Sequence, residues 1–120
     1  MNQIPKNSKS KALIHPIVQR TYLFAQNTRA FLRCCKHDFI SLEDAKQLTR
    51  SSGSVGANYI EANKSLSKKD FRYRIKICRK EVKESIYWLK LLPLQQQYEQ
   101  QKFQLIDEAT QLLKIFSSIN

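Results

Sequence analysis

The feature that most constrains the fold is a regular apolar pattern in the second half of the chain. Apolar or small residues recur there at alternating steps of four and three: Phe71, Ile75, Cys78, Val82, Ser85, Leu89 and Leu92. This spacing places them on one side of an α-helix, as in coiled coils and antiparallel bundles. The pattern therefore predicts a helix that packs one face, here called the seam, against other helices.

A run of small residues, 51–58, precedes this helix and includes Gly53 and Gly56. Glycine costs about 1 kcal/mol relative to alanine in a helix interior, so two glycines need a reason. With Ser52 and Ala57, they would let a neighbouring helix approach closely. A phosphate-binding loop is disfavoured, because the run lacks the Gly-Lys-Ser/Thr ending and no strand precedes it.

Three further segments show helical periodicity. Capping signals and prolines place the four helices at about Leu13–Lys36, from Ser41 to the turn at 63–66, from Ser67 to Leu92, and at about Tyr98–Ser118. Four helices with short links predict an all-α fold, an antiparallel up-down-up-down four-helix bundle. The bundle is expected at residues 12–120, after a basic, flexible N-terminal arm at residues 1–11. The expected core includes Phe24, Leu48, Val55, Phe71, Ile75, Cys78, Val82, Leu89, Leu105 and Leu112.

The chain is strongly basic, with 21 Lys and Arg against 10 Asp and Glu and a net charge of +11. In a domain of 120 residues, such an excess favours a polyanionic partner, although charge can also serve solubility alone. No stretch approaches the roughly 18 apolar residues of a membrane span. The adjacent cysteines Cys34 and Cys35 do not resemble a disulfide framework, so a reducing cytoplasm is expected.

The cations of the third helix gather on one face. Eight of them fall within an arc of about 120°, far from the seam, and are called the basic stripe: Lys68, Lys69, Arg72, Lys76, Arg79, Lys80, Lys83 and Lys90. The stripe is long enough to follow several phosphates of a nucleic acid, and binding of this kind is largely independent of base sequence. A merely solvated helix face is the alternative.

A third strip of the same helix mixes apolar and acidic residues: Asp70, Tyr73, Ile77, Glu81, Glu84 and Trp88. Exposed Trp and Ile are unusual on a monomer, so Ile77, Glu81, Glu84 and Trp88 are candidates for an oligomer interface. Glu81 and Glu84 are poor candidates for paired catalytic carboxylates, because nothing supplies a partner acid, nucleophile or metal ligand.

Two other groups of polar residues are candidates for a role. On the second helix, Arg50, Asn58 and Glu61 share a face and either bind a neighbouring helix or subunit, or are solvated. Cys34, Cys35 and His37 lack the spacing of a metal site, so core packing and a loop histidine are favoured. We expect no metal and no cofactor.

Two segments resemble a known family. Residues 47–62, from Gln47-Leu48-Thr49-Arg50 through Gly53-Ser54-Val55-Gly56 to Glu61-Ala62, are similar to the signature of the bacterial four-helix-bundle family, also called the 23S ribosomal RNA intervening-sequence protein or S23 family. Residues 80–92, Lys80-Glu81-Val82-Lys83-Glu84-Ser85-Ile86-Tyr87-Trp88-Leu89-Lys90-Leu91-Leu92, are similar to that family's third helix.

The resemblance implies an up-and-down bundle with a basic surface that assembles into a ring of subunits, often a pentamer. Some members are encoded within intervening sequences of ribosomal RNA genes. A related group serves diversity-generating retroelements as an accessory protein that binds the reverse transcriptase and RNA. No catalytic residue is established for the family, so the resemblance informs the fold more firmly than the function.

Together these features favour a non-enzymatic, oligomeric protein that binds nucleic acid, either RNA or DNA, through phosphate contacts. It would serve as an accessory to an RNA or reverse-transcriptase complex. The alternative is a structural or protein-interaction module whose basic face docks an acidic protein. An enzyme lacks the usual His, Asp and Glu groupings, and membrane binding is disfavoured because the apolar faces are committed to the bundle.

Overall fold

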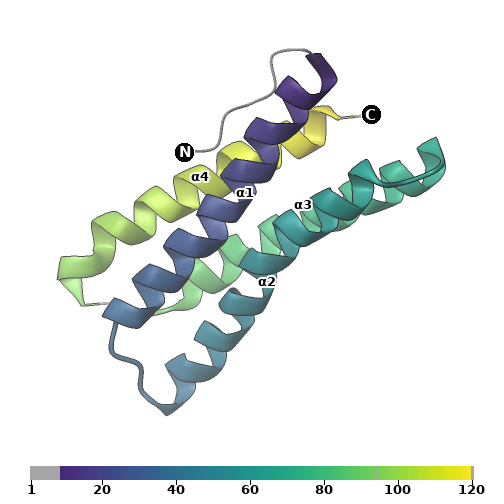
Figure 1. The fold of residues 1–120 in the computed structure, drawn as a ribbon. Coiled ribbons are helices and arrows are strands. Elements are labelled where there is room, and N and C mark those ends of the chain that lie inside the picture. The colour runs from purple at the N-terminus through teal and green to yellow at the C-terminus, as the bar shows by residue number, and fades with distance from the viewer. Residues whose placement is uncertain (1–8, 94, 120) are drawn as a thin grey trace.

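The structure is a computed structural model that describes residues 9–93 and 95–119, with side chains from Pro16 onward. The described chain forms four long helices, α1 (Lys9–Cys34), α2 (Phe39–Asn63), α3 (Lys68–Leu91) and α4 (Glu99–Ser118), with a short 3-10 helix, η1 (Gln96–Tyr98), before α4. Each long helix packs against its neighbours in the chain, and α1 also packs against α4. The predicted all-α up-down bundle is therefore confirmed (Figure 1).

The pair formed by α2 and α3 has the most extensive packing in the bundle, and the pair formed by α1 and α4 has the least. The turn between α2 and α3 projects beyond the ends of the other two helices, at the upper right of Figure 1. Within the described chain, no helix combines the length and the apolar content needed to cross a membrane.

The core follows the predicted seam. Nine of the ten residues expected in the core are buried: Phe24, Leu48, Val55, Ile75, Cys78, Val82, Leu89, Leu105 and Leu112. Phe71 is only partly buried, which corrects the prediction for that residue. It lies on the first turn of α3, in the projecting hairpin, and lines an open hollow there with Ala62 and Leu66. Periodicity gives the direction of a side chain, but not whether another helix covers it.

The small residues of α2 allow α1 to approach closely. A Cβ atom built on Gly56 would lie 2.8 Å from Thr21 Oγ1 and 3.2 Å from Thr21 Cβ, both on α1. A Cβ atom on Gly53 would lie 3.0 Å from the Arg29 guanidinium. Ser52 is buried, whereas Ala57 is exposed and takes no part in this contact, contrary to prediction.

On another side of α2, hydroxyl and thiol groups lie against α3. Ser51 Oγ and Ser85 Oγ are 2.9 Å apart, and both residues are fully buried. The Cys78 thiol donates to the Val55 carbonyl over 3.6 Å, and burial raises the pKa of Cys78 to about 12. These short polar side chains satisfy each other inside the core, as buried polar groups must.

Helix α2 begins earlier than predicted. Its N-cap is Asp38, whose carboxylate accepts a hydrogen bond of 2.7 Å from the Ser41 amide, so Ser41 is not the cap. This hydrogen bond lowers the pKa of Asp38. Ser67 caps α3 as expected and accepts from the Asp70 amide over 3.1 Å. With Asp38 as the cap, α2 begins at Phe39 and gains one turn, 39–41, compared with the helix predicted to begin at Ser41.

At its N-terminal end, α1 begins at Lys9 rather than near Leu13. Pro16 therefore lies beyond the first turn, where its missing amide leaves one helical hydrogen bond unmade. The expected flexible arm at residues 1–11 falls mostly outside the described residues, and only its last three residues are described, as helix. Leu92 is the C-cap of α3, directly before Pro93, as the effect of proline on the preceding residue predicts.

The packing of the seam can be tested at Val82, which is fully buried. Val82→Ala should lower the free energy of unfolding by about 1–3 kcal/mol, because it removes methyl groups and leaves a cavity. Urea denaturation followed by circular dichroism measures this loss. Lys83→Ala, at the exposed neighbouring position, is the control and should change stability by less than about 0.5 kcal/mol. Equal midpoints for Val82→Ala and the parent would contradict the assignment of the seam.

Candidate nucleic-acid interface

The basic stripe lies on the outward face of α3. Seven of its eight side chains are exposed, and the eighth, Arg79, is partly buried. Helix α3 contains nine Lys and Arg residues and three acids, Asp70, Glu81 and Glu84, none of which interrupts the stripe. At 1.5 Å per residue, the stripe from Lys68 to Lys90 extends over about 33 Å.

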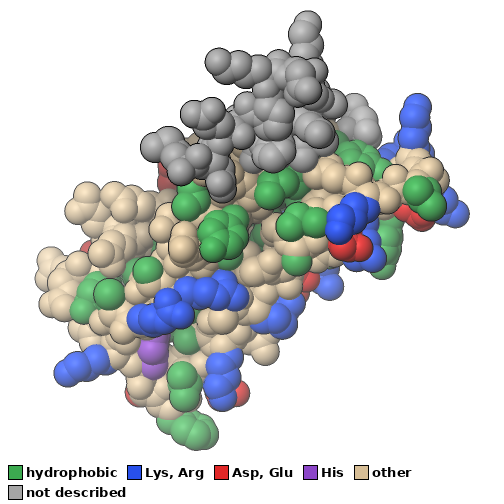
Figure 2. Space-filling view, viewed as in Figure 1, with side chains coloured by type: hydrophobic (Ala, Val, Ile, Leu, Met, Phe, Trp, Pro, Cys, Tyr) green, Lys and Arg blue, Asp and Glu red, His purple; other side chains and the backbone are tan. Residues whose placement is uncertain are grey.

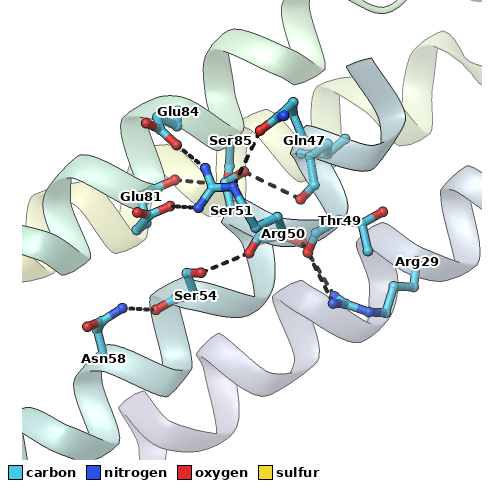
Figure 3. A network of polar contacts seen from close by, with 12 residues as sticks. Arg29, Gln47, Thr49, Arg50, Ser51, Ser54, Asn58, Glu81, Glu84 and Ser85 are labelled. Atoms are coloured by element: carbon cyan, nitrogen blue, oxygen red, sulfur yellow. Dashed lines mark hydrogen bonds and ion pairs between the residues drawn. The ribbon is translucent and has the colours of Figure 1, made fainter. Parts of the chain in front are cut away.

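The orientation of α3 is fixed by polar contacts from α2 on the side away from the stripe. Arg50 of α2 lies between two carboxylates of α3, donating to Glu81 Oε1 over 3.1 Å and to Glu84 Oε2 (Figure 3). Further along the same interface, Arg74 of α3 donates to Asn58 Oδ1 over 3.0 Å. Arg50 and Asn58 thus bind a neighbouring helix, which was one of the two alternatives left by the sequence, whereas Glu61 is exposed.

The ion pair with Glu81 is the most shielded of these contacts. The Glu81 side chain is only 8% exposed, whereas that of Arg50 is 49% exposed. A buried carboxylate without a partner is costly, so Arg50 provides the positive charge that makes this position acceptable. Desolvation lowers the pKa of Arg50, but its hydrogen bonds to both acids and their negative charges outweigh this effect and raise the pKa.

Two other arginines are engaged between helices. Arg20 of α1 binds Glu108 of α4 with two hydrogen bonds of 3.0 and 2.7 Å, and these raise the pKa of Arg20. Arg29 of α1 donates to the Thr49 carbonyl of α2 over 3.0 Å. In contrast, no cation of the basic stripe forms an ion pair with any described carboxylate. The arginines that face other helices hold the bundle together, whereas the cations of the stripe have no acidic partner among the described residues.

Near its start, the stripe borders an open groove of about 810 Å³ between α3 and the end of α4. Lys69, Arg72, Lys76 and Arg79 line it from α3, together with Tyr73. Ile75 lies at its base and is almost fully buried, whereas Ser117 and Ile119 line the side of α4. The groove is thus lined by four cations and a tyrosine on the side of α3.

Arg79 connects the two helices that form this groove. Its guanidinium donates to the Phe116 carbonyl over 3.4 Å, near the C-terminal end of α4. Carbonyls at the end of a helix lack intrahelical partners and carry partial negative charge, so a cation is favoured there. Arg79 is therefore the stripe residue with a structural contact of its own, and the other seven cations remain available to a ligand.

The face of the molecule seen in Figure 2 carries its cations in separate groups. Figure 2 shows the side on which α1 and α2 lie in front of α3, and Lys and Arg side chains appear there as separate groups with neutral surface between them. Hydrophobic side chains are interspersed among them.

The four candidate interface residues lie on the side of α3 toward α2. Glu81 and Glu84 form ion pairs within the chain. Ile77 and Trp88 are partly buried, and Trp88 packs against the core and against the edge of Tyr87, with ring centroids 4.9 Å apart. The Trp88 indole N–H is buried and has no hydrogen-bond partner among the described residues. Much of this strip is therefore covered by the monomer itself.

Two of the three cysteines, Cys34 and Cys35, lie near the α1–α2 turn together with His37. Cys34 is exposed and Cys35 is buried, which raises the pKa of the Cys35 thiol. His37 Nε2 lies 2.9 Å from the Leu32 carbonyl oxygen. The described residues contain no group of three or more His, Cys, Asp and Glu side chains placed to hold a metal ion.

Comparisons with known proteins agree on one family. The family model described as "23S rRNA-intervening sequence protein" matches residues 15–118, which include most of α1 and all of the other helices. Among solved structures, a protein of unknown function from the S23 ribosomal protein family of Bacteroides thetaiotaomicron is similar, with a TM-score of 0.72 and 28% sequence identity. That similarity covers 85% of this chain and 95% of the other chain. No curated protein matches the chain.

The Arg50 contact can be tested by a double-mutant cycle. Arg50→Ala should lower the free energy of unfolding by about 1–3 kcal/mol, because it leaves the Glu81 carboxylate shielded and unpaired. In the Glu81→Gln background the same substitution should cost less, since no buried charge remains to be compensated. Urea denaturation of the four proteins measures the coupling. Arg72→Ala, at an exposed position of the stripe, is the control, and strictly additive effects of the Arg50 and Glu81 substitutions would contradict the ion pair.

Proposed function

Because the chain belongs to the 23S rRNA-intervening sequence protein family, we propose that it is a non-enzymatic, cytoplasmic protein that binds nucleic acid through phosphate contacts. The observation that carries this proposal is the row of exposed cations on α3 that no described carboxylate neutralises. Either RNA or DNA fits the chemistry, since both present regularly spaced phosphates.

Electrostatics supports a polyanion as the partner. Acids close to the stripe would weaken its attraction for phosphate, but Glu81 and Glu84 are both bound to Arg50. Lysine side chains on an exposed helix face contact phosphates as mobile point charges, and such contacts position a nucleic acid without reading its bases. The binding proposed here is therefore independent of sequence. In the cell, the resemblance noted above suggests an accessory role in an RNA or reverse-transcriptase complex.

The absence of an enzymatic role is also part of the proposal. A catalytic carboxylate pair needs space for a substrate and an acid or base at a useful pKa. The closest pair on α3, Glu81 and Glu84, is occupied by a guanidinium. Carboxylates held in this way stabilise the packing of α2 on α3.

We also propose a homo-oligomer, a ring of five subunits as the resemblance implies. Large apolar side chains remain exposed on several elements, among them Phe39, Ile40, Ile60 and Phe103. Such groups commonly mark surfaces that contact another protein. A ring would also place several copies of the basic stripe in one particle, and phosphate contacts from linked copies raise the overall affinity for a long nucleic acid.

The phosphate contacts can be tested by removing three stripe charges together. Arg72→Gln/Lys76→Gln/Lys83→Gln should weaken binding to unrelated RNA and DNA sequences to a similar degree. It should also flatten the dependence of log affinity on log salt by about 0.7 to 0.9 for each phosphate that the variant can no longer neutralise. Filter binding from about 50 to 300 mM salt measures both quantities. Stability should barely change, because the three side chains are exposed.

A matched control removes the same charge elsewhere. Arg33→Gln/Lys36→Gln/Lys46→Gln lowers the net charge equally at exposed positions on α1, the α1–α2 turn and α2. This variant should bind almost as tightly as the parent if the stripe is the binding surface. If both triple variants lose equal affinity, only net charge matters. If poly-glutamate competes as well as nucleic acid does, an acidic protein is the partner instead.

The oligomer can be tested by light scattering at micromolar protein concentration. We expect a molar mass several times that of the 14.1 kDa chain, with five chains as the specific expectation. A mass of one chain would refute the assembly. Phe39→Asp and Ile40→Asp should lower the mass if the apolar surface at the start of α2 is buried between subunits. Because both residues are exposed, neither substitution should unfold the monomer.

A further inference from the structure

The groove between α3 and the end of α4 is lined by an exposed aromatic side chain, which is not part of the core. Tyr73 is 62% exposed and lines the groove beside the cations of the stripe. None of the described hydrogen bonds or aromatic pairs involves it. Sequence periodicity assigns Tyr73 to the strip of α3 that contains Ile77, and only the structure places it at the groove.

Two of its four neighbours on the helix surface are cations, and the other two are Asp70 and Ile77. Lys69 precedes Tyr73 by four residues and Lys76 follows it by three, so both lie next to it on the helix surface. Both also line the groove. A planar aromatic surface between positive side chains is the combination by which proteins hold single-stranded nucleic acid: the cations follow the backbone, and a base stacks on the ring.

The other lining residues are compatible with the same ligand. Ile119 provides apolar surface and Ser117 a neutral hydroxyl group, whereas Ile75 is almost fully buried. From Lys69 to Arg79 the wall extends over about 15 Å along the axis of α3. Successive phosphates of a stacked strand rise about 3.4 Å along the axis of the strand, so a strand that lies along this wall places a few phosphates beside its cations.

We propose that this groove binds single-stranded RNA or DNA, with a base stacked on Tyr73 and phosphates on Lys69, Arg72 and Lys76. The inference rests on the proposed nucleic-acid binding and adds the form of the nucleic acid to it. A double helix keeps the faces of its bases within the stack, so it can contact the cations but not the ring. Tyr73 therefore provides selectivity for strandedness without selectivity for sequence, because every base has an aromatic face.

Fluorescence anisotropy with short labelled oligonucleotides tests this selectivity. The probes are an unstructured pyrimidine single strand, as RNA and as DNA, and a DNA duplex of the same length. Tyr73→Ala should weaken binding of both single strands by about 5- to 150-fold, the loss expected when one base no longer stacks. Binding of the duplex and the salt dependence of all three should stay as in the parent, because no charge is removed.

Two variants serve as controls. Tyr73→Phe keeps the aromatic face and should retain the affinity of the parent for single strands. Tyr22→Ala removes an equally exposed tyrosine, 64% accessible, from α1 and should change nothing. Circular dichroism of each variant checks that the fold is retained. We expect it to be, because Tyr73 and Tyr22 are both exposed.

The possible results distinguish a failure of the stacking role of Tyr73 from a failure of nucleic-acid binding as such. If the parent binds single strands and duplex, and Tyr73→Ala weakens neither, nucleic-acid binding stands and the stacking role of Tyr73 is wrong. If Tyr73→Ala weakens duplex and single strands equally, the tyrosine is not selective and the inference is also overturned. If the parent binds none of the probes at low salt, both the inference and the proposed function fail.

Discussion

The close approach of α2 to both of its neighbours is the constraint on which the rest of the bundle depends. On the side of α2 that faces α1, Gly56 has no side chain, and a Cβ atom there would collide with the side chain of Thr21. Because Thr21 is β-branched, it has little freedom to move away. Toward α3, the contact is made by the hydroxyl pair of Ser51 and Ser85. Small residues at these two points let α1 and α3 pack closely on α2.

This packing determines which face of α3 is exposed. Once the seam of α3 is buried and Arg50 binds Glu81 and Glu84, the helix has no rotational freedom left, and the stripe must point outward. Glu81 and Glu84 lie on the side that meets α2, and the cations of the stripe lie on the side that meets solvent. A chain of high positive charge thereby separates the arginines that stabilise the bundle from the cations that are free to meet a ligand.

The fold could be predicted from the sequence because the seam is periodic. Apolar residues at alternating steps of three and four indicate a helix that packs one face against other helices. The sequence did not reveal which polar residues pair across helices, such as Arg50 with Glu81 or Arg20 with Glu108. Those pairs depend on how far each helix is rotated and shifted against its neighbour, and periodicity carries no such information. The position of Tyr73 was missed for the same reason. The N-cap at Asp38 was missed because Ser41 is an equally good capping residue three positions later.

The basic stripe has a consequence for the stability of the protein itself. Like charges four residues apart on a helix repel each other, and the pairs Lys68 with Arg72, Arg72 with Lys76, and Lys76 with Lys80 all have this spacing. In the protein without a ligand, neighbouring cations along α3 therefore repel one another weakly. A polyanion bound along the stripe would weaken this repulsion, and its binding would then stabilise the folded protein. The cations proposed to bind nucleic acid thus also repel one another weakly when the protein is alone.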